Sequence, residues 1–173
     1  MTSPAAQPRI GESLRLRPPR HRVSSRAIIW WTTQAALEVT AVLIPLLVTL
    51  LLWTDARPWL VPATVAVALI GLGYLLVMPR WRFRVHRWET TAHAVYTSAG
   101  WINQEWRVAP MSRIQTVDTE RGPLQQLFGL ATVTVTTASA AGALRLAGLD
   151  SAVADELVEQ LTETTQATPG DAT

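Results

Sequence analysis

Two long apolar stretches separated by only four residues constrain this chain more than any other feature. The first runs from Ala27 to Trp53 and the second from Pro58 to Pro79, and the second carries no charge. A helix of about 22 residues spans about 33 Å, which is enough to cross the roughly 30 Å hydrocarbon core of a bilayer. Because the link is so short, both stretches are predicted to form an antiparallel transmembrane hairpin whose two ends emerge on the same side.

The arginines predict the orientation of this hairpin. All 15 basic residues are Arg, and they cluster before residue 27 and between residues 80 and 87, whereas the link has only Arg57. The positive-inside rule therefore places both termini in the cytoplasm of a multi-pass inner-membrane protein. A cleaved signal peptide is discounted, because the first stretch is too long and lacks a small-residue cleavage site. Interfacial aromatic belts would account for five tryptophans, namely Trp30, Trp31, Trp53, Trp59 and Trp81.

Glu38 is the one charged residue inside a predicted span. An ionisable residue at membrane depth suggests function by default, so a small transporter or membrane enzyme using Glu38 is one alternative. Against it, the second stretch offers only Thr64 and Tyr74 as polar residues that could face Glu38. We expect Glu38 to lie near the wet end of its span.

After Pro79 the pattern changes to the period-two alternation of half-buried strands. Residues 80–88 are predicted to form a first strand, with Arg80, Arg82 and Arg84 on one face. The further expected elements are a hairpin over 94–110 that turns at Gly100, strands over 114–119, 130–138 and 143–147, and a helix starting at Asp150 or Ser151. On these strands Trp106 is expected in the core, and the ladder of Thr132, Thr134 and Thr136 is expected to face solvent.

The fold class that follows is a membrane α-helical hairpin plus an all-β or α+β barrel of six to seven strands with a C-terminal capping helix. The predicted division of the chain is a basic cytoplasmic tail (1–26), the transmembrane hairpin (27–79), a cytoplasmic domain (80–163) and a disordered tail (164–173). One small domain on a membrane anchor is what a chain of 173 residues can accommodate.

Residues 113–130 carry a resemblance to a known family. The run RIQTV from Arg113 to Val117, followed by Gly122-Pro123 and then LFGL, resembles the signature of bacterial pleckstrin-homology-like (PH-like) membrane proteins, the YdbS-like family. With the two apolar stretches, WRFRVHRWETT and AVYTSAGWINQEWRVAP, the resemblance covers about residues 25–163. It implies a PH-like barrel on a membrane hairpin, and it implies no known catalytic residues.

The residue types that catalysis needs are absent or isolated. There is no cysteine, which excludes disulfides, thiolate metal sites and cysteine nucleophiles. His21, His86 and His93 lack metal-ligand spacing and are expected on the solvated surface, and no phosphate-binding loop or nucleophile elbow is present. Nucleic-acid binding is disfavoured because no candidate recognition helix carries arginines. We therefore predict a binding protein with no enzymatic activity, cofactor or metal.

The arginine-rich segment after the second stretch is the strongest candidate site. Its residues are Arg80, Arg82, Arg84, Arg87 and Trp81. They could serve only to anchor the helix end, or they could also contact anionic headgroups, which contributes about 1 kcal/mol per residue. The remainder of the domain is acidic, with four arginines against ten acidic residues after Arg87.

This acidity favours a protein partner over a lipid headgroup. The hypothesis is a membrane-anchored adaptor for assembly of a membrane complex, with Trp101, Arg113 and Gln115 as partner-contact candidates. Anionic phospholipid binding by the arginine strand is the alternative. Association through the hairpin with a related membrane protein or a second copy is a further possibility.

Overall fold

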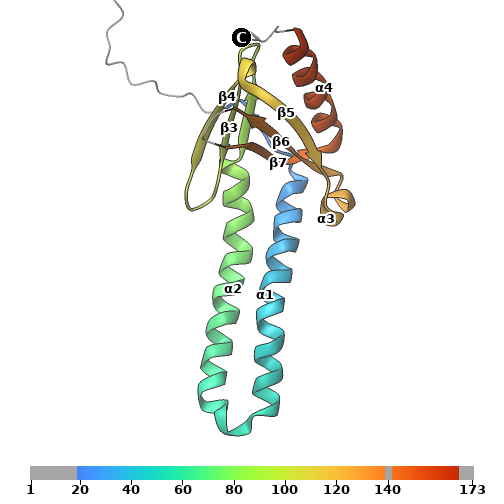
Figure 1. Ribbon diagram of the computed structural model, residues 1–173. Coiled ribbons are helices and arrows are strands. Elements are labelled where there is room, and N and C mark those ends of the chain that lie inside the picture. Colours follow the sequence, from blue (N-terminus) through green and yellow to red (C-terminus); the bar gives the residue numbers. More distant parts are fainter. Residues whose placement is uncertain (1–18, 139–141, 168–173) are drawn as a thin grey trace, which may run out of the picture.

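A helical hairpin carries the whole domain at one of its ends (Figure 1). The computed structural model describes residues 19–138 and 142–167. Helix α1 spans Arg26–Leu52 and helix α2 spans Arg57–Val85, with the short 3-10 turn η1 (Thr54–Ala56) between them. Both helices are long and apolar enough to cross a membrane, and the apolar side chains along them are mostly exposed. The predicted two-helix hairpin is confirmed.

Helix α2 does not end at Pro79 but continues to Val85, so the strand predicted over residues 80–88 is wrong. Extending an existing helix adds one backbone hydrogen bond per residue, which a new strand without a neighbour cannot match. On a helix, residues four apart share a face, so Arg80 lies above Arg84 while Arg82 shares its side with His86. The predicted one-sided arginine ladder therefore does not exist.

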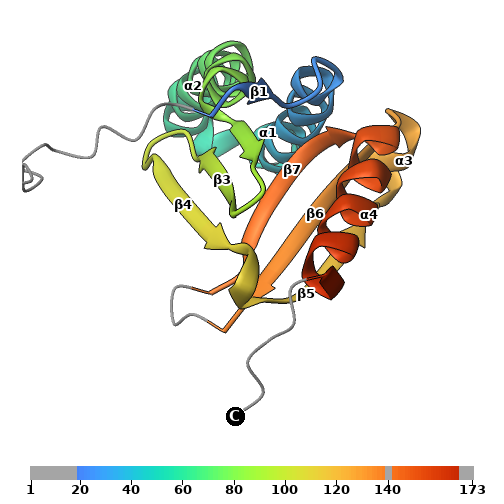
Figure 2. The ribbon, with the colours of Figure 1, turned by 90° about the horizontal axis from the view of Figure 1, so that it is seen from above.

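Two antiparallel sheets form the domain. Sheet A has the strand order β1 (His21–Arg22), β2 (Arg87–Thr90), β3 (Ala94–Ala99) and β4 (Glu105–Pro110). Sheet B has the strand order β5 (Ile114–Glu120), β6 (Leu130–Thr137) and β7 (Leu144–Asp150). The turn η2 (Met111–Arg113) joins the sheets, α3 (Pro123–Leu127) connects β5 to β6, and α4 (Ser151–Ala167) follows β7. Viewed from above, the sheets meet at an angle and α4 lies across sheet B (Figure 2). The predicted barrel with its C-terminal helix is confirmed.

Both ends of the predicted domain shift in the structure. Strand β1 pairs with β2, so residues 21–22 of the predicted basic tail belong to sheet A. Arg20 and Arg26 form ion pairs with Glu89 and Asp150, both at 3.4 Å. At the other end α4 continues to Ala167, so residues 164–167 of the predicted disordered tail are helical. Residues 1–18 and 168–173 lie outside the described part of the chain.

The first turns of α1 belong to the core of the domain. Trp31 is fully buried and Trp30 is 8% exposed, so the prediction that this pair lies in an aromatic belt is wrong. At the far end of the hairpin Trp53 and Trp59 are 61% and 81% exposed, as residues of a belt would be. The rest of the core comes from the inner faces of the sheets and from α4, and includes Val95, Leu130, Val133, Val135, Leu146, Leu149, Leu157 and Leu161.

Gly148 lies where sheet B packs closely against α1. It is the extra residue of a β-bulge between Ala147 and Leu149, its φ is +81°, and a Cβ there would lie 2.9 Å from the Cβ of Ala27. The N–H of Ser24 donates to its carbonyl at 2.9 Å. The junction between the domain and the hairpin therefore requires a residue without a side chain at this position.

We expect Gly148→Ala to lower the free energy of unfolding by about 2 to 3 kcal/mol, because it combines backbone strain with overpacking. Gly142→Ala is the matched control: its φ is +79°, but nothing lies within 4 Å of the added Cβ. Strain alone should cost this variant about 1 kcal/mol. Thermal unfolding in detergent measures both, and equal losses would contradict the packing argument.

Candidate functional site: a cleft between the membrane helices and the sheets

A cleft of about 510 Å³ lies where the hairpin meets the two sheets. Helices α1 and α2 form one wall, the end of β3 a second, and sheet B with α3 the third. Its polar lining consists of Gln34, Arg82, His86, Glu120, Gln125, Thr132 and Arg145. These residues come from six different elements, so tertiary packing alone brings them together.

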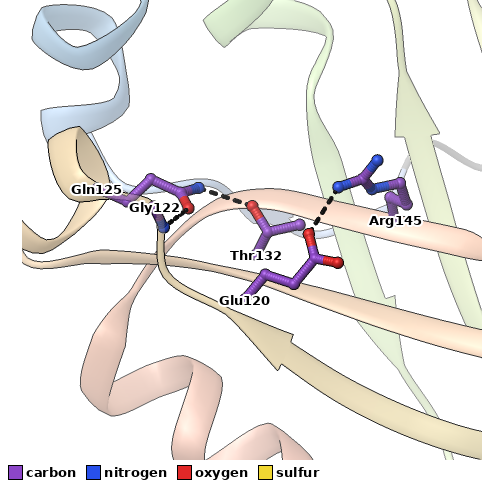
Figure 3. Close-up of polar contacts among 5 residues, drawn as sticks. All are labelled: Glu120, Gly122, Gln125, Thr132 and Arg145. Carbon is purple, nitrogen blue, oxygen red and sulfur yellow. Dashed lines mark hydrogen bonds and ion pairs between the residues drawn. The ribbon is translucent and has the colours of Figure 1, made fainter.

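A buried amide and a hydroxyl fix the wall formed by sheet B. The Gln125 side chain accepts from the N–H of Gly122 at 3.0 Å and donates to the hydroxyl of Thr132 at 2.7 Å (Figure 3). Gln125 and Thr132 are only 6% and 4% exposed. The prediction that Thr132 faces solvent is therefore wrong, because α3 folds back over the start of β6.

The same wall carries an ion pair that spans the sheet. Arg145 on β7 and Glu120 at the end of β5 lie 2.9 Å apart across β6 (Figure 3). Both side chains are more than half exposed. An ion pair this exposed contributes at most about 1 kcal/mol, so little opposes its exchange for another charged group.

Arg82 packs against an aromatic ring on the opposite wall. Its guanidinium carbon lies 4.7 Å from the centroid of Trp31, a cation–π contact. The described part of the chain places no carboxylate within 4.0 Å of its side-chain nitrogens. The planar guanidinium thus keeps its donors available on the side of the cleft.

His86 caps the end of α2 and is 6% exposed, so its predicted surface position is wrong. Its ring packs 5.0 Å from Trp31, and Nδ1 donates to the carbonyl of Arg82 at 2.8 Å. Burial, assisted by the nearby charge of Arg82, lowers the pKa of His86 to about 4. With His86 neutral, the charged groups of the cleft are two arginines and one glutamate.

The other predicted headgroup residues surround the junction without entering the cleft. Arg80 donates to the carbonyl of Leu76 at 2.8 Å and is exposed, as is Arg84. Trp81 is 44% exposed, and Arg87 lies on β2 opposite Ser98. Lipid contacts of these four residues stay predictions.

The partner-contact candidates do not form one surface. Trp101 lies in the loop between β3 and β4, beside α2, whereas β4 leads away from the hairpin to η2 and β5, which hold Arg113 and Gln115 (Figure 1). Arg113 and Gln115 are exposed. Their role as contacts stays a prediction, but no single partner surface unites them with Trp101.

Glu38 has a partner that our prediction discounted. The hydroxyl of Tyr74 on α2 donates to the Glu38 carboxylate at 3.2 Å. The other residues that line the groove beside this pair are apolar, namely Val39, Val42, Val67, Ile70 and Gly71. Within the described residues no group of three or more potential ligands could hold a metal ion. The carboxylate is thus satisfied by a hydrogen bond between the two helices.

The chain is similar in sequence to a known family of bacterial proteins. A family model described as "Bacterial PH domain" matches residues 28–165, which include nearly all of the hairpin helices and of the domain. The chain belongs to the bacterial PH-domain family. It is 27% identical over 156 residues to the UPF0699 transmembrane protein YdbS of Bacillus subtilis (strain 168), a match that covers 88% of this chain and 97% of that protein. No solved structure matches.

Membership confirms the resemblance of residues 113–130 and places the cleft within a bacterial PH domain on a transmembrane hairpin. Arg82 was among the predicted site residues, but Gln125, Thr132 and Arg145 were missed. One local signal existed for Gln125, since Gly122-Pro123 starts a helix and a side-chain amide at its third position caps that start. No local signal indicated that Arg145 would face Glu120.

Proposed function

We propose that this bacterial PH-domain protein is a membrane-anchored binding module without catalytic activity, and that its cleft binds an anionic phospholipid headgroup. The observation that carries this proposal is Arg82, which stacks on Trp31 and has no carboxylate of the described residues within 4.0 Å, in a cleft where the hairpin leaves the membrane. Arg82 lies about 4.5 Å beyond Pro79, the end of the charge-free stretch, at the height of headgroups.

Charge and shape support the same ligand class. A guanidinium offers paired donors that match a phosphate, and Arg145 can exchange Glu120 for such a group at little cost. Near an anionic leaflet each arginine adds about 1 kcal/mol. With both termini in the cytoplasm, as the arginines predict, the headgroup would belong to the cytoplasmic leaflet.

We expect the double substitution Arg82→Gln and Arg145→Gln to weaken binding of phosphatidylglycerol about 30-fold, the equivalent of about 2 kcal/mol. The measurement is native mass spectrometry of the full-length protein in phosphatidylcholine nanodiscs doped with phosphatidylglycerol. The control is Arg113→Gln with Arg121→Gln, which removes the same charge outside the cleft. Equal lipid occupancy in both double variants would refute the headgroup site.

A protein partner is the second candidate, supported by the outer face of sheet A. Trp106 and Val108 on β4 are 42% and 45% exposed, so the prediction that Trp106 lies in the core is wrong. Alternation along β4 turns Ala109, not Trp106, inward. No described strand pairs with the outer edge of β4. An adaptor acting through this face would co-purify with a protein from its native membranes, and Trp106→Ser would abolish that association.

A further inference from the structure

The loop between β3 and β4, residues 100–104, extends beside α2 towards the far end of the hairpin (Figure 1). Its Trp101 ring meets the ring of Tyr74 edge-on, with centroids 5.9 Å apart. Tyr74 lies about 7.5 Å before Pro79, inside the charge-free stretch of α2. The Trp101 side chain therefore reaches the level of the transmembrane segment.

We propose that this loop is a second membrane contact, in which Trp101 and Ile102 insert into the leaflet on the side of the domain. Ile102 is 75% exposed and Trp101 is 37% exposed, an adjacent pair of large apolar side chains at a loop tip. Residues 100–104 carry no charge. Because Trp101 contacts Tyr74 inside the transmembrane segment, both side chains lie next to the lipids of the bilayer.

The depth of the contact agrees with the dimensions of a bilayer. If the hydrocarbon core begins at Pro58, Tyr74 lies about 24 Å along α2, within about 6 Å of the opposite interface. Tryptophan is enriched at this depth, where the indole is buried and its N–H reaches water. The polar residues Asn103 and Gln104 then return the chain towards Glu105, where sheet A resumes.

The backbone holds the loop in this orientation. Gly100 has a φ of +110°, and a Cβ there would overlap the carbonyl oxygen of Asn103. The tip is therefore a tight turn that only glycine can begin. Because Ala99 and Gly100 also line the cleft, the inserted loop fixes one wall of the cleft against the leaflet.

The absence of cysteine makes a direct test possible, since each introduced cysteine is a unique labelling site. Ile102→Cys in the full-length chain is labelled with a nitroxide in protein-free phosphatidylglycerol and phosphatidylcholine liposomes. Collision with a water-soluble nickel chelate and with oxygen then reports depth. Leu72→Cys, on the exposed face of α2 and about 9 Å inside the same interface, serves as the membrane reference, and Thr119→Cys, exposed on β5, serves as the aqueous reference.

We expect the nickel accessibility of the label at 102 to be lower than that of the label at 119 by a factor of about three or more, and its oxygen accessibility to approach that of the label at 72. Asn103→Cys is a second site that leaves both apolar side chains intact, and its label should lie at the interface, between the two references. Nickel accessibility at 102 and 103 equal to that at 119 would overturn the proposal. Since the liposomes contain no other protein, burial by a partner cannot produce the expected result.

Discussion

Replacing Trp31 by alanine is expected to lower the free energy of unfolding of the domain by about 3 to 5 kcal/mol. Trp31 is fully buried and lies between Trp30, at 5.7 Å, and His86, at 5.0 Å, with the Arg82 guanidinium on its face. Its removal leaves a cavity at the point where α1 enters the core. The loss also frees Arg82 from its stacking position, so headgroup binding should weaken in the same variant.

Denaturant unfolding in detergent, followed by near-ultraviolet circular dichroism, measures this effect. The matched control is Trp53→Ala, which removes the same side chain from a position that is 61% exposed at the far end of the hairpin. This control should cost less than about 1 kcal/mol. Similar losses in the two variants would show that Trp31 is not part of the core that stabilises the domain.

Acidification is expected to destabilise the domain through His86. Its pKa is about 4 in the folded state against 6.5 as the ordinary value, so the unfolded chain takes up the proton first as the pH falls. The stability contributed by neutral His86 is complete above pH 6.5 and is lost progressively down to pH 4. The shift corresponds to about 3 kcal/mol over this window.

His86→Gln should remove this part of the pH dependence, because glutamine does not titrate. The control is His93→Gln, which replaces an exposed histidine in the turn before β3 and should leave the wild-type pH dependence intact. Melting temperatures between pH 7.5 and pH 4 provide the measurement. Parallel losses of stability in the wild type and in His86→Gln would assign the acid sensitivity to other groups.

Periodicity predicted most elements of this fold but failed at the end of α2. Residues 80–86 alternate as a strand does, yet residues 80–85 are helical because Pro79 does not interrupt the preceding helix. This helical conformation has two consequences. His86 becomes the buried cap of α2, and Arg82 faces the cleft whereas Arg80 and Arg84 do not. One incorrect boundary therefore misplaced both the histidine and the arginines.

The cleft was predictable only in part, for a related reason. Arg82 was identifiable because arginines beside an apolar stretch have a known relation to headgroups. The pairing of Glu120 with Arg145, and of Gln125 with Thr132, depends on how β5, α3, β6 and β7 pack. Alternation predicts which residues of a strand share a face, but it does not predict what covers that face. In β6, α3 covers the face that carries Thr132.

Local patterns in the sequence are sufficient to predict the transmembrane hairpin and the strand-rich domain with its C-terminal helix, and the lack of cysteine excludes thiol chemistry. The length of an apolar stretch, its lack of charged residues and the period-two alternation of a strand are properties of short segments. They can therefore be recognised without knowledge of the fold. Three positions depend on tertiary packing instead: Trp30 and Trp31 enter the core, Trp106 is exposed, and Trp101 contacts Tyr74. These positions depend on contacts between residues far apart in the chain. An apolar side chain is equally suited to contact with lipid, to the core of the domain or to an interface, so its residue type does not distinguish among them.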